Sequence, residues 1–292
     1  MGFWNALFGG TEQTSEEEKQ EEEAKRFDLL KYDGIRAYKM GQTDFAIRCL
    51  NEALKMHDDL EARDYLSQAL VRNGDLEAGL RELQYIARSE PGNQALFVRM
   101  AQIAYMLEDY DRMTEACRTA QSIDDTFPPV YYLTAQAKIG QNDYVGAIAM
   151  LTKAITLQEE YAEAYLLRAK ILLQMGDTAA ADEDADWLMN NVGDHEDVLL
   201  LKARIEAAKG NADEAIRLYG RVIDENPFSI EAFRERGQLR FDSGDKDGAD
   251  EDLRKVLELD PNQLADVSGE YSAEGIEQHV RQAYSAINPL GL

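Results

Sequence analysis

Apolar and small residues recur along this chain with a period of 34 residues. Stretches of about fourteen residues carry apolar positions three and four apart, which is the spacing of an amphipathic helix. Short polar turns with Gly, Asn or Asp separate these stretches, among them GQTD, NGDL, QNDY and SGDK. Each period therefore predicts one helix, a turn and a second helix.

Seven such repeats account for most of the chain. Five of them follow one another in steps of 34 residues without a gap, and two earlier ones start near Phe27 and Leu60. The predicted repeats are residues 27–59, 60–93, 94–127, 128–161, 162–195, 196–229 and 230–263.

Two positions of the repeat are occupied almost throughout by small residues. The eighth position holds Gly34, Ser67, Ala101, Ala135, Ala169, Ala203 and Gly237. The twentieth position holds Ala46, Gly79, Met113, Ala147, Ala181, Ala215 and Ala249, of which only the methionine is large. Small side chains let two helices approach closely. A helix pair of this length cannot bury its own apolar face, so the repeats are expected to stack on one another.

The second halves of repeats six and seven, GNADEAIRLYGRVIDENP and GDKDGADEDLRKVLELDP, resemble the second helix of the tetratricopeptide repeat. Pro227 and Pro261 close these repeats as Pro91 closes repeat two. The resemblance extends from residue 27 to about residue 263, and the whole chain looks like bacterial members of this family. It implies an all-α fold, a right-handed α-solenoid of about seven tetratricopeptide helix-turn-helix repeats.

Residues 264–292 leave the period and predict a C-terminal capping helix and tail. Ile276, Val280, Ala283, Tyr284 and Ile287 follow helical spacing, with polar residues on the opposite side. A terminal repeat would otherwise expose its stacking face. This helix is expected to end before Pro289, since the residue before a proline disfavours helix.

Residues 1–26 form a leader with an apolar beginning and an acidic continuation. Phe3, Trp4, Leu7 and Phe8 share one side of a short helix, and a Glu-rich run follows that is expected to extend into the first repeat helix. No base precedes Lys19, so attraction to anionic lipid is not expected. Docking onto a partner is one hypothesis, and self-docking near Lys170 and Arg204 is another. Unchanged amide exchange around Lys170 after deletion of residues 1–12 would contradict self-docking.

The tetrapeptide ADED occurs at 181–184 and again at 249–252, each time at the start of a predicted second helix. Asp182, Asp184 and Asp186 resemble the opening of a calcium loop, but Trp187 stands where that loop needs Gly. No metal site is therefore expected. The acids are expected to be exposed and to favour the helix N-terminus, so that Asp184→Asn is close to silent.

The charge of the chain narrows the classes of partner. With 31 basic and 56 acidic residues the formal net charge is -25, which argues against binding to nucleic acid. No stretch reaches the roughly 18 apolar residues of a membrane span, and no signal peptide is recognisable. Cys49 and Cys117 stand in apolar-periodic helical stretches, so buried free thiols are expected. Together these features predict a soluble cytoplasmic protein without integral membrane association.

Catalytic patterns are missing from the sequence. His57, His195 and His279 lie far apart, and no phosphate-binding glycine loop or nucleophile elbow occurs. The sequence therefore predicts a binding protein without enzymatic activity or a cofactor.

The family resemblance implies that the first helices of the repeats line a concave groove. Positions five, nine and twelve share one side of these helices, and their 21 residues include only one acid, Asp64. Glutamines at these positions can form hydrogen bonds with the backbone of a bound peptide, and the apolar neighbours can contact its side chains. The alternative is that position twelve is partly a core position. The candidate groove residues are Lys31, Tyr38, Gln68, Arg99, Gln102, Tyr105, Tyr132, Gln136, Lys170, Arg204, Arg234 and Gln238.

One specialisation of the family clamps the acidic tail of heat-shock chaperones. Lys31 and Arg99 match its first and last residues, whereas Ile35, Tyr65 and Ala95 depart from it, so this ligand is not favoured. The predicted function is a protein-interaction scaffold with a peptide or protein partner. A chaperone-like or assembly factor for unfolded chains and a regulatory subunit of an enzyme are the alternatives.

Overall fold

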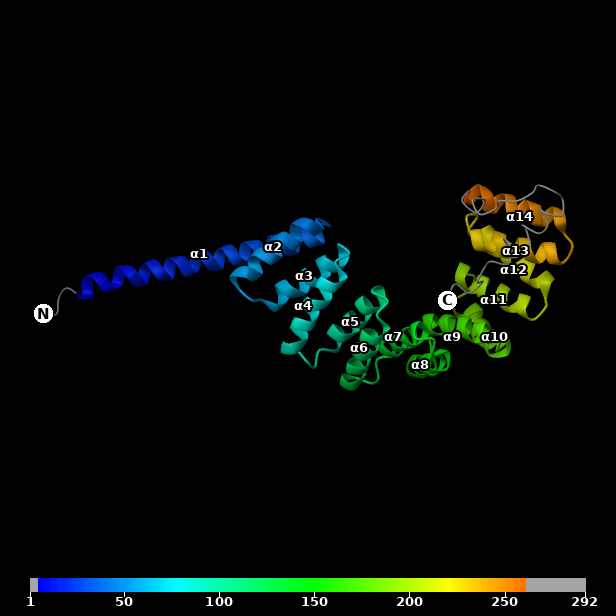
Figure 1. Ribbon diagram of the computed structural model, residues 1–292, viewed down its shortest axis with the longest axis horizontal. Helices are drawn as coiled ribbons and strands as arrows, with labels where there is room; N and C mark the ends of the chain where they lie inside the picture. Colours follow the sequence, from blue (N-terminus) through cyan, green and yellow to red (C-terminus); the bar gives the residue numbers. More distant parts are fainter. Residues whose placement is uncertain (1–4, 261–292) are drawn as a thin grey trace. The chain divides into compact units, whose positions relative to one another are not determined.

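A computed structural model describes residues 5–260, with side chains described for Glu16 and from Glu18 onward. Within this range the secondary structure is entirely helical, as predicted (Figure 1). The helices are α1 (Asn5–Lys39), α2 (Thr43–Met56), α3 (Leu60–Arg72), α4 (Leu76–Ser89), α5 (Gln94–Met106), α6 (Tyr110–Ile123), α7 (Pro128–Gly140), α8 (Tyr144–Leu157), α9 (Ala162–Gln174), α10 (Thr178–Asn191), α11 (Glu196–Ala208), α12 (Ala212–Glu225), α13 (Ile230–Asp242) and α14 (Lys246–Leu259).

The chain divides into two compact halves between Asp143 and Tyr144. In the N-terminal half, α1 packs on α2, α3 on α4 and α5 on α6; in the C-terminal half, α9 packs on α10, α11 on α12 and α13 on α14. From α3 on, every odd-numbered helix begins at the residue where a repeat was expected to start. The prediction of an α-solenoid with about seven repeats is confirmed.

A left-handed residue separates the two helices of every repeat. At the fifteenth position φ is positive for Gly41, Gly74, Gly176, Gly210 and Gly244, and also for Glu108 and Asn142. Such a residue ends the first helix and reverses the chain, and glycine adopts this conformation without steric cost. The glycines of these turns thus meet one backbone requirement, a positive φ at the fifteenth repeat position.

The small residues of the repeat lie at the contacts between helices. All residues at the eighth and twentieth positions are buried. Ser67 donates a hydrogen bond of 3.0 Å to the backbone oxygen of Gly79 across its helix pair. Met113, the one large residue, is fully buried in a cluster in which Ala101, Ala104 and Ala116 leave room for it. The small side chains around Met113 therefore accommodate its larger volume.

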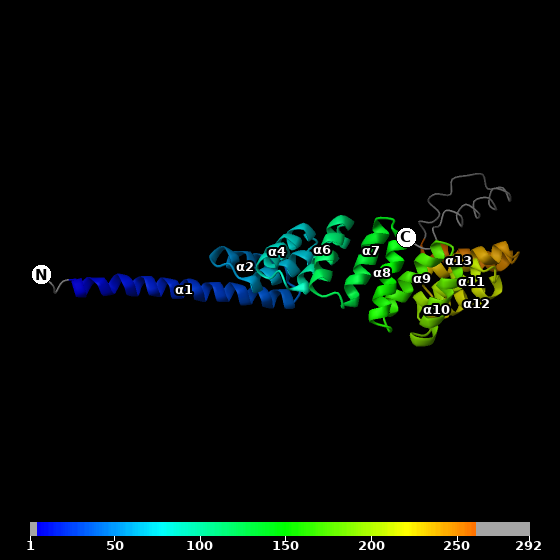
Figure 2. The same ribbon diagram turned by 90° about the horizontal axis from the view of Figure 1, so that it is seen from below.

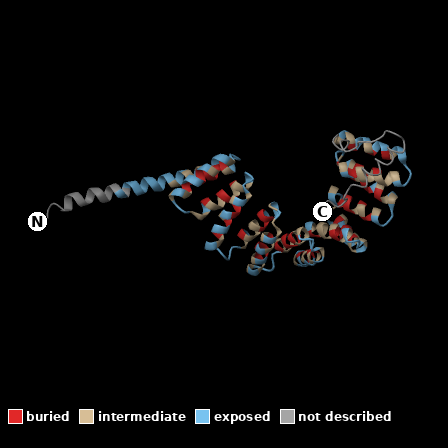
Figure 3. Cartoon of the chain, viewed as in Figure 1, coloured by how far each residue is buried: buried red, intermediate tan, exposed pale blue. Residues whose placement is uncertain are grey.

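Helix α1 is much longer than the other helices, with 35 residues. At 1.5 Å per residue it measures about 52 Å, and its N-terminal part extends beyond α2 (Figures 1 and 2). The described residues of this extension are exposed (Figure 3), and Glu21 pairs with Lys25 at 2.8 Å. The Glu-rich run thus continues into the first repeat helix without a break.

Two expectations fall on residues outside the described range. The C-terminal capping helix was expected within 264–292, and Phe3 and Trp4 of the leader precede Asn5. Among the described residues, no helix combines the length and the apolar character needed to cross a membrane.

Candidate functional site

The candidate residues of the N-terminal half lie on the first helices of four repeats, α1, α3, α5 and α7. We call the surface formed by the fifth, ninth, twelfth and thirteenth repeat positions of these helices the first-helix face. Helix α1 packs beside α3, and α5 beside α7. On α5, Gln102 is exposed and Tyr105 is 45% exposed. Tyr38, Gln68, Arg99, Tyr132 and Gln136 are half-buried. Glutamine and aromatic side chains are therefore accessible at this face.

Lys31 lies in the interior of the first two repeats and not at their surface. Its Nζ is 2.9 Å from Asp59 Oδ1 and 2.8 Å from Glu61 Oε2, and only 7% of the residue is exposed. Burial on its own would lower the pKa of Lys31, but the hydrogen bonds to Glu61 and Asp59 raise it above its ordinary value. Asp59 also caps α3 by accepting a hydrogen bond from Ala62 N at 2.7 Å. Lys31 therefore ties α1 to the beginning of α3.

Arg99, the second residue that matches the chaperone-tail clamp, is also paired within the chain. Its guanidinium forms an ion pair with Asp64, which additionally accepts a hydrogen bond of 2.8 Å from Gln68 Nε2. Asp64, the one acid at positions five, nine and twelve, thus neutralises Arg99, one of the candidate groove residues. Neither cation of the clamp is free to hold an acidic tail.

Two tyrosines and two cations that the sequence analysis did not combine meet at the ends of α1 and α3. The rings of Tyr38 and Tyr65 contact edge to face, with centroids 5.9 Å apart. The Arg72 guanidinium lies 4.1 Å from the centroid of Tyr38 and donates a hydrogen bond of 2.9 Å to its backbone oxygen. Lys39 Nζ lies 5.8 Å from the centroid of Tyr65. Lys39 and Arg72 both occupy the thirteenth repeat position, which was the signal in the sequence.

In the C-terminal half, Arg204 belongs to a partly buried polar group. Its Nε is 2.9 Å from Glu235 Oε2 and its Nη2 is 2.7 Å from Glu231 Oε2, while the Tyr219 hydroxyl donates to Glu235 at 2.7 Å. Burial opposes its charge, but the bonds to Glu235 raise the pKa of Arg204 above its ordinary value. Burial, reinforced by the negative charge of Glu235, raises the pKa of Tyr219. Arg204 therefore joins α11 to α13.

The other candidates of the C-terminal half are half-buried. Gln238 Nε2 donates to Asp242 at 2.8 Å. Among the residues that the structure describes, Lys170 and Arg234 form no ion pair, and the Nε of Arg234 has no hydrogen-bond partner. These three side chains lie on α9 and α13, on either side of Arg204 in the sequence.

The two acidic tetrapeptides contain buried ion pairs, so the expectation that their acids are exposed is wrong for Asp184 and Asp252. Asp184 is 4% exposed and accepts hydrogen bonds from Arg168 Nε at 2.8 Å and Nη2 at 2.6 Å. Asp252 is 1% exposed and accepts from Arg236 Nη2 at 2.6 Å and Arg240 Nη1 at 3.0 Å.

These contacts explain why the tetrapeptide recurs. The twenty-third position of the repeat points toward the first helix of the same pair, and in repeats five and seven an arginine stands 16 residues earlier, at the seventh position. A carboxylate buried there needs a cation opposite. Asp184→Asn should therefore not be silent, contrary to the expectation from sequence.

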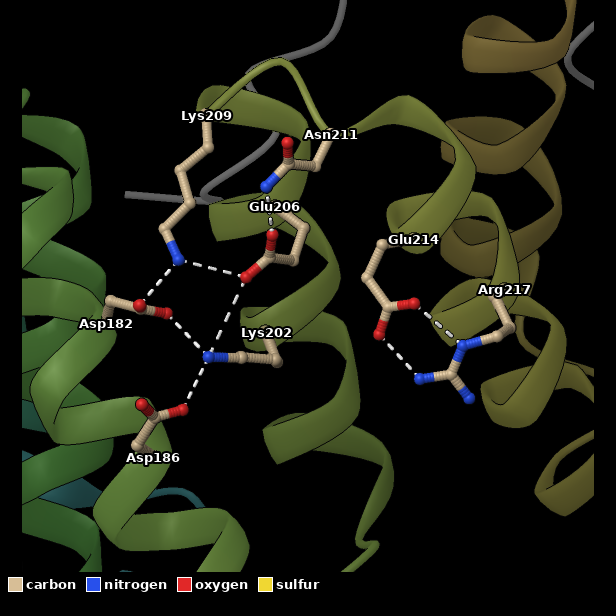
Figure 4. Close-up of polar contacts among 8 residues, drawn as sticks. All are labelled: Asp182, Asp186, Lys202, Glu206, Lys209, Asn211, Glu214 and Arg217. Carbon is tan, nitrogen blue, oxygen red and sulfur yellow. Dashed lines mark hydrogen bonds and ion pairs between the residues drawn. The ribbon is translucent and has the colours of Figure 1, made fainter.

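Asp182 of the first tetrapeptide joins two repeats through lysines (Figure 4). Lys202 Nζ is 2.6 Å from Asp182 Oδ1 and also contacts Asp186, while Lys209 bridges Asp182 and Glu206. Burial raises the pKa of Asp182, but the hydrogen bonds from Lys202 and Lys209 outweigh it and hold this pKa below its ordinary value. Asp182, Asp184 and Asp186, whose spacing resembles the opening of a calcium loop, thus face cations of the chain itself. No group of three or more possible metal ligands occurs in the described part of the chain.

Replacing Lys202 by glutamine is expected to cost about 1 kcal/mol of unfolding free energy at pH 7, since the pairs are partly exposed. The pKa of Asp182 is lower in the folded state than in the unfolded chain, where it is about 4. The stability that Asp182 contributes is therefore present above its unfolded pKa and is lost as the pH falls through its folded pKa. The deficit of Lys202→Gln should therefore shrink in acid. Hydrogen exchange of α10 and α11 at neutral and acidic pH measures it, and Lys246→Gln, exposed on α14, is the control. A deficit independent of pH would contradict this assignment.

Both cysteines are buried and free, as expected. Burial raises the pKa of the Cys117 thiol to about 11. Such a thiol stays protonated at neutral pH and is a poor nucleophile.

Comparison with known protein families identifies these helix pairs as tetratricopeptide repeats. Two tetratricopeptide repeat family models match the chain, one at residues 138–205 and the other at residues 34–93 and 200–263, and together they match more than half of it. A search of curated proteins returned no match.

Solved structures resemble the chain in fold. A tetratricopeptide repeat protein from Parabacteroides merdae has a TM-score of 0.68 at 15% identity, covering 89% of this chain and 99% of its own. PilF of Pseudomonas aeruginosa has a TM-score of 0.58 at 17% identity, covering 74% of this chain and 99% of its own. YrrB, described as having an unusual peptide-binding site, has a TM-score of 0.52 at 16% identity, covering 62% of this chain and 94% of its own.

Proposed function

Because the chain belongs to the tetratricopeptide repeat family, we propose that it is a protein-interaction scaffold that binds a peptide or partner segment along the first-helix face of its N-terminal half. The exposure of Gln102 and Tyr105, one turn apart on α5, carries this proposal. An amide can both donate to and accept from a peptide backbone. Exposed tyrosines are typical anchors of protein interfaces.

The ligand that we propose is a peptide and not a nucleic acid. A net charge of -25 opposes the approach of phosphate, and the cations Lys31 and Arg99 are neutralised within the chain. The proposed role is binding without catalysis. The buried ionisable groups described above, such as Asp252 and Asp184, are engaged in holding helices together.

A selection from a phage-displayed library of random peptides on the full chain tests the proposal. Selected peptides should bind the double variant Gln102→Glu, Tyr105→Ala at least about tenfold more weakly in fluorescence titrations, since the anchor and an amide are lost. The control Gln158→Glu, Val145→Ala alters an exposed glutamine and an exposed apolar residue of the C-terminal half, and it should bind like the natural chain.

The same selection separates the alternatives. Selected peptides that share one motif support a scaffold with a discrete partner, whereas weak peptides without a motif indicate a factor that holds unfolded chains. Equal binding by the double variant and the natural chain would contradict the proposed face. Hydrogen exchange of a chain without residues 1–12 tests self-docking of the leader, because a docked leader should protect the amides around Lys170 and its removal should accelerate their exchange. Unchanged exchange there would contradict self-docking.

A further inference from the structure

From Phe27 onward, Lys39 and Arg72 differ from the other described cations of the first helices of the N-terminal half by lacking a carboxylate partner. On α3, α5, α7 and the part of α1 from Phe27 onward, every other described Lys or Arg forms an ion pair. These paired residues are Lys31, Arg36, Arg63, Arg99 and Lys138. Among the described first helices of the N-terminal half, from Phe27 onward, Lys39 and Arg72 are therefore the exception, in a chain whose net charge is -25.

The two cations are nonetheless held in place. Arg72 lies over the ring of Tyr38 and donates to its backbone oxygen across the boundary between repeats one and two. Lys39 lies over the ring of Tyr65, which contacts Tyr38. Both residues are exposed. Stacking on an aromatic ring restricts a long side chain and leaves its charge available to a ligand.

Their place at helix ends gives a structural reason for positive charge, because cations favour a helix C-terminus. The same position of α5 and α7, however, holds Met106 and Gly140. A cation at the thirteenth position is therefore no general requirement of the repeat. On α5, Tyr105 and Met106 are 45% and 54% exposed, so the face changes from cationic to apolar along the row of first helices.

We propose that Lys39 and Arg72 bind a carboxylate side chain of the peptide partner, and that Tyr105 and Met106 receive an apolar side chain of the same peptide. The inference rests on the proposed function and adds the chemistry of the ligand. Helix α4 packs on both α3 and α5, so one repeat separates Arg72 from Tyr105 and Met106. A helix spacing of about 10 Å and an advance of about 3.3 Å per residue in an extended chain then give a separation of about three to five residues between the acidic and apolar side chains. Repulsion from the acidic remainder of the chain helps to fix the register of the acid.

The library selection described above, repeated on Lys39→Gln, Arg72→Gln, tests this inference. Peptides from the natural chain should be enriched in Asp or Glu about three to five residues from an apolar residue. They should bind the variant about fivefold to tenfold more weakly, and the loss should shrink at high salt, which screens exposed charges. Arg88→Gln, Arg118→Gln on α4 and α6 makes the same change of charge at exposed positions and should bind like the natural chain.

Each outcome bears on one of the two proposals or on both. Peptides without acidic enrichment, or equal binding by natural chain and variant, overturn this inference; the proposed function then still stands if Gln102→Glu, Tyr105→Ala abolishes binding. A selection that yields no peptide overturns both. Lys39→Gln alone, which removes an exposed side chain, should retain the fold and show about half of the effect on a logarithmic scale. Circular dichroism of each variant checks folding.

Discussion

Asp252→Ala is expected to lower the free energy that holds α13 and α14 closed by about 3 kcal/mol or more. Asp252 is 1% exposed, and its carboxylate pairs with both Arg236 and Arg240. Its removal leaves the partly buried guanidinium of Arg236 without an anion and leaves Arg240 only the exposed Asp245, 3.7 Å away, which costs far more than the pair itself contributes. Hydrogen exchange of the full chain measures the effect, because repeat proteins open locally and a single global transition is not assured.

Asp250→Ala is the matched control, since Asp250 belongs to the same tetrapeptide and is exposed. It should change the opening free energy by no more than about 0.5 kcal/mol. Asp184→Ala should behave like Asp252→Ala in α9 and α10, where Arg168 is the partner left unpaired. Equal effects of Asp250→Ala and Asp252→Ala would show that the buried pair is not what distinguishes these acids.

The order of helices could be predicted because it depends on features that repeat in the sequence. A fixed period, small residues at two positions and a turn residue at a third determine where each helix starts and which side it buries. Glu108 and Asn142 show the limit of a rule based on glycine, because both adopt positive φ at the turn position. The repeat, and not the residue type, determined the turn there.

The buried acids could not be predicted from the local pattern. Their tetrapeptides were expected at the start of the second helices, where an acid is usually exposed and favourable. Asp184 and Asp252 are instead the seventh residues of α10 and α14, beyond the first turn. Their burial depends on which sides of two helices meet, and on an arginine 16 residues earlier in the chain. The arginine at the seventh position was visible in the sequence, but its relevance required the packing of the pair.

Three positions of the repeat do not determine the charge of the candidate face. The partners of Lys31 and Arg204 include Glu61, Glu231 and Glu235, which stand at other positions of the repeat. Side chains of neighbouring repeats reach across and neutralise these cations. A charge pattern along one line of a helix therefore overestimates the cations that a ligand can meet.

Ala215→Leu is expected to destabilise the C-terminal half by about 1 to 3 kcal/mol. Ala215 is fully buried at the twentieth position, in a cluster with Leu199, Ala203 and Ala232. A leucine needs space that neighbouring helices fill, so helices α11 to α13 must move apart or adopt strained side-chain conformations. Ala208→Leu, at an exposed position of α11, should stay within about 0.5 kcal/mol.

The location of the damage is as informative as its size. In a solenoid each repeat contacts only its neighbours, so hydrogen exchange should accelerate in α11, α12 and α13 and remain unchanged in α1 to α6. Uniform acceleration along the whole chain would contradict the view that stability is set repeat by repeat. Tolerance of leucine at Ala215 together with a large cost at Ala208 would contradict the role of small residues in bringing these helices together.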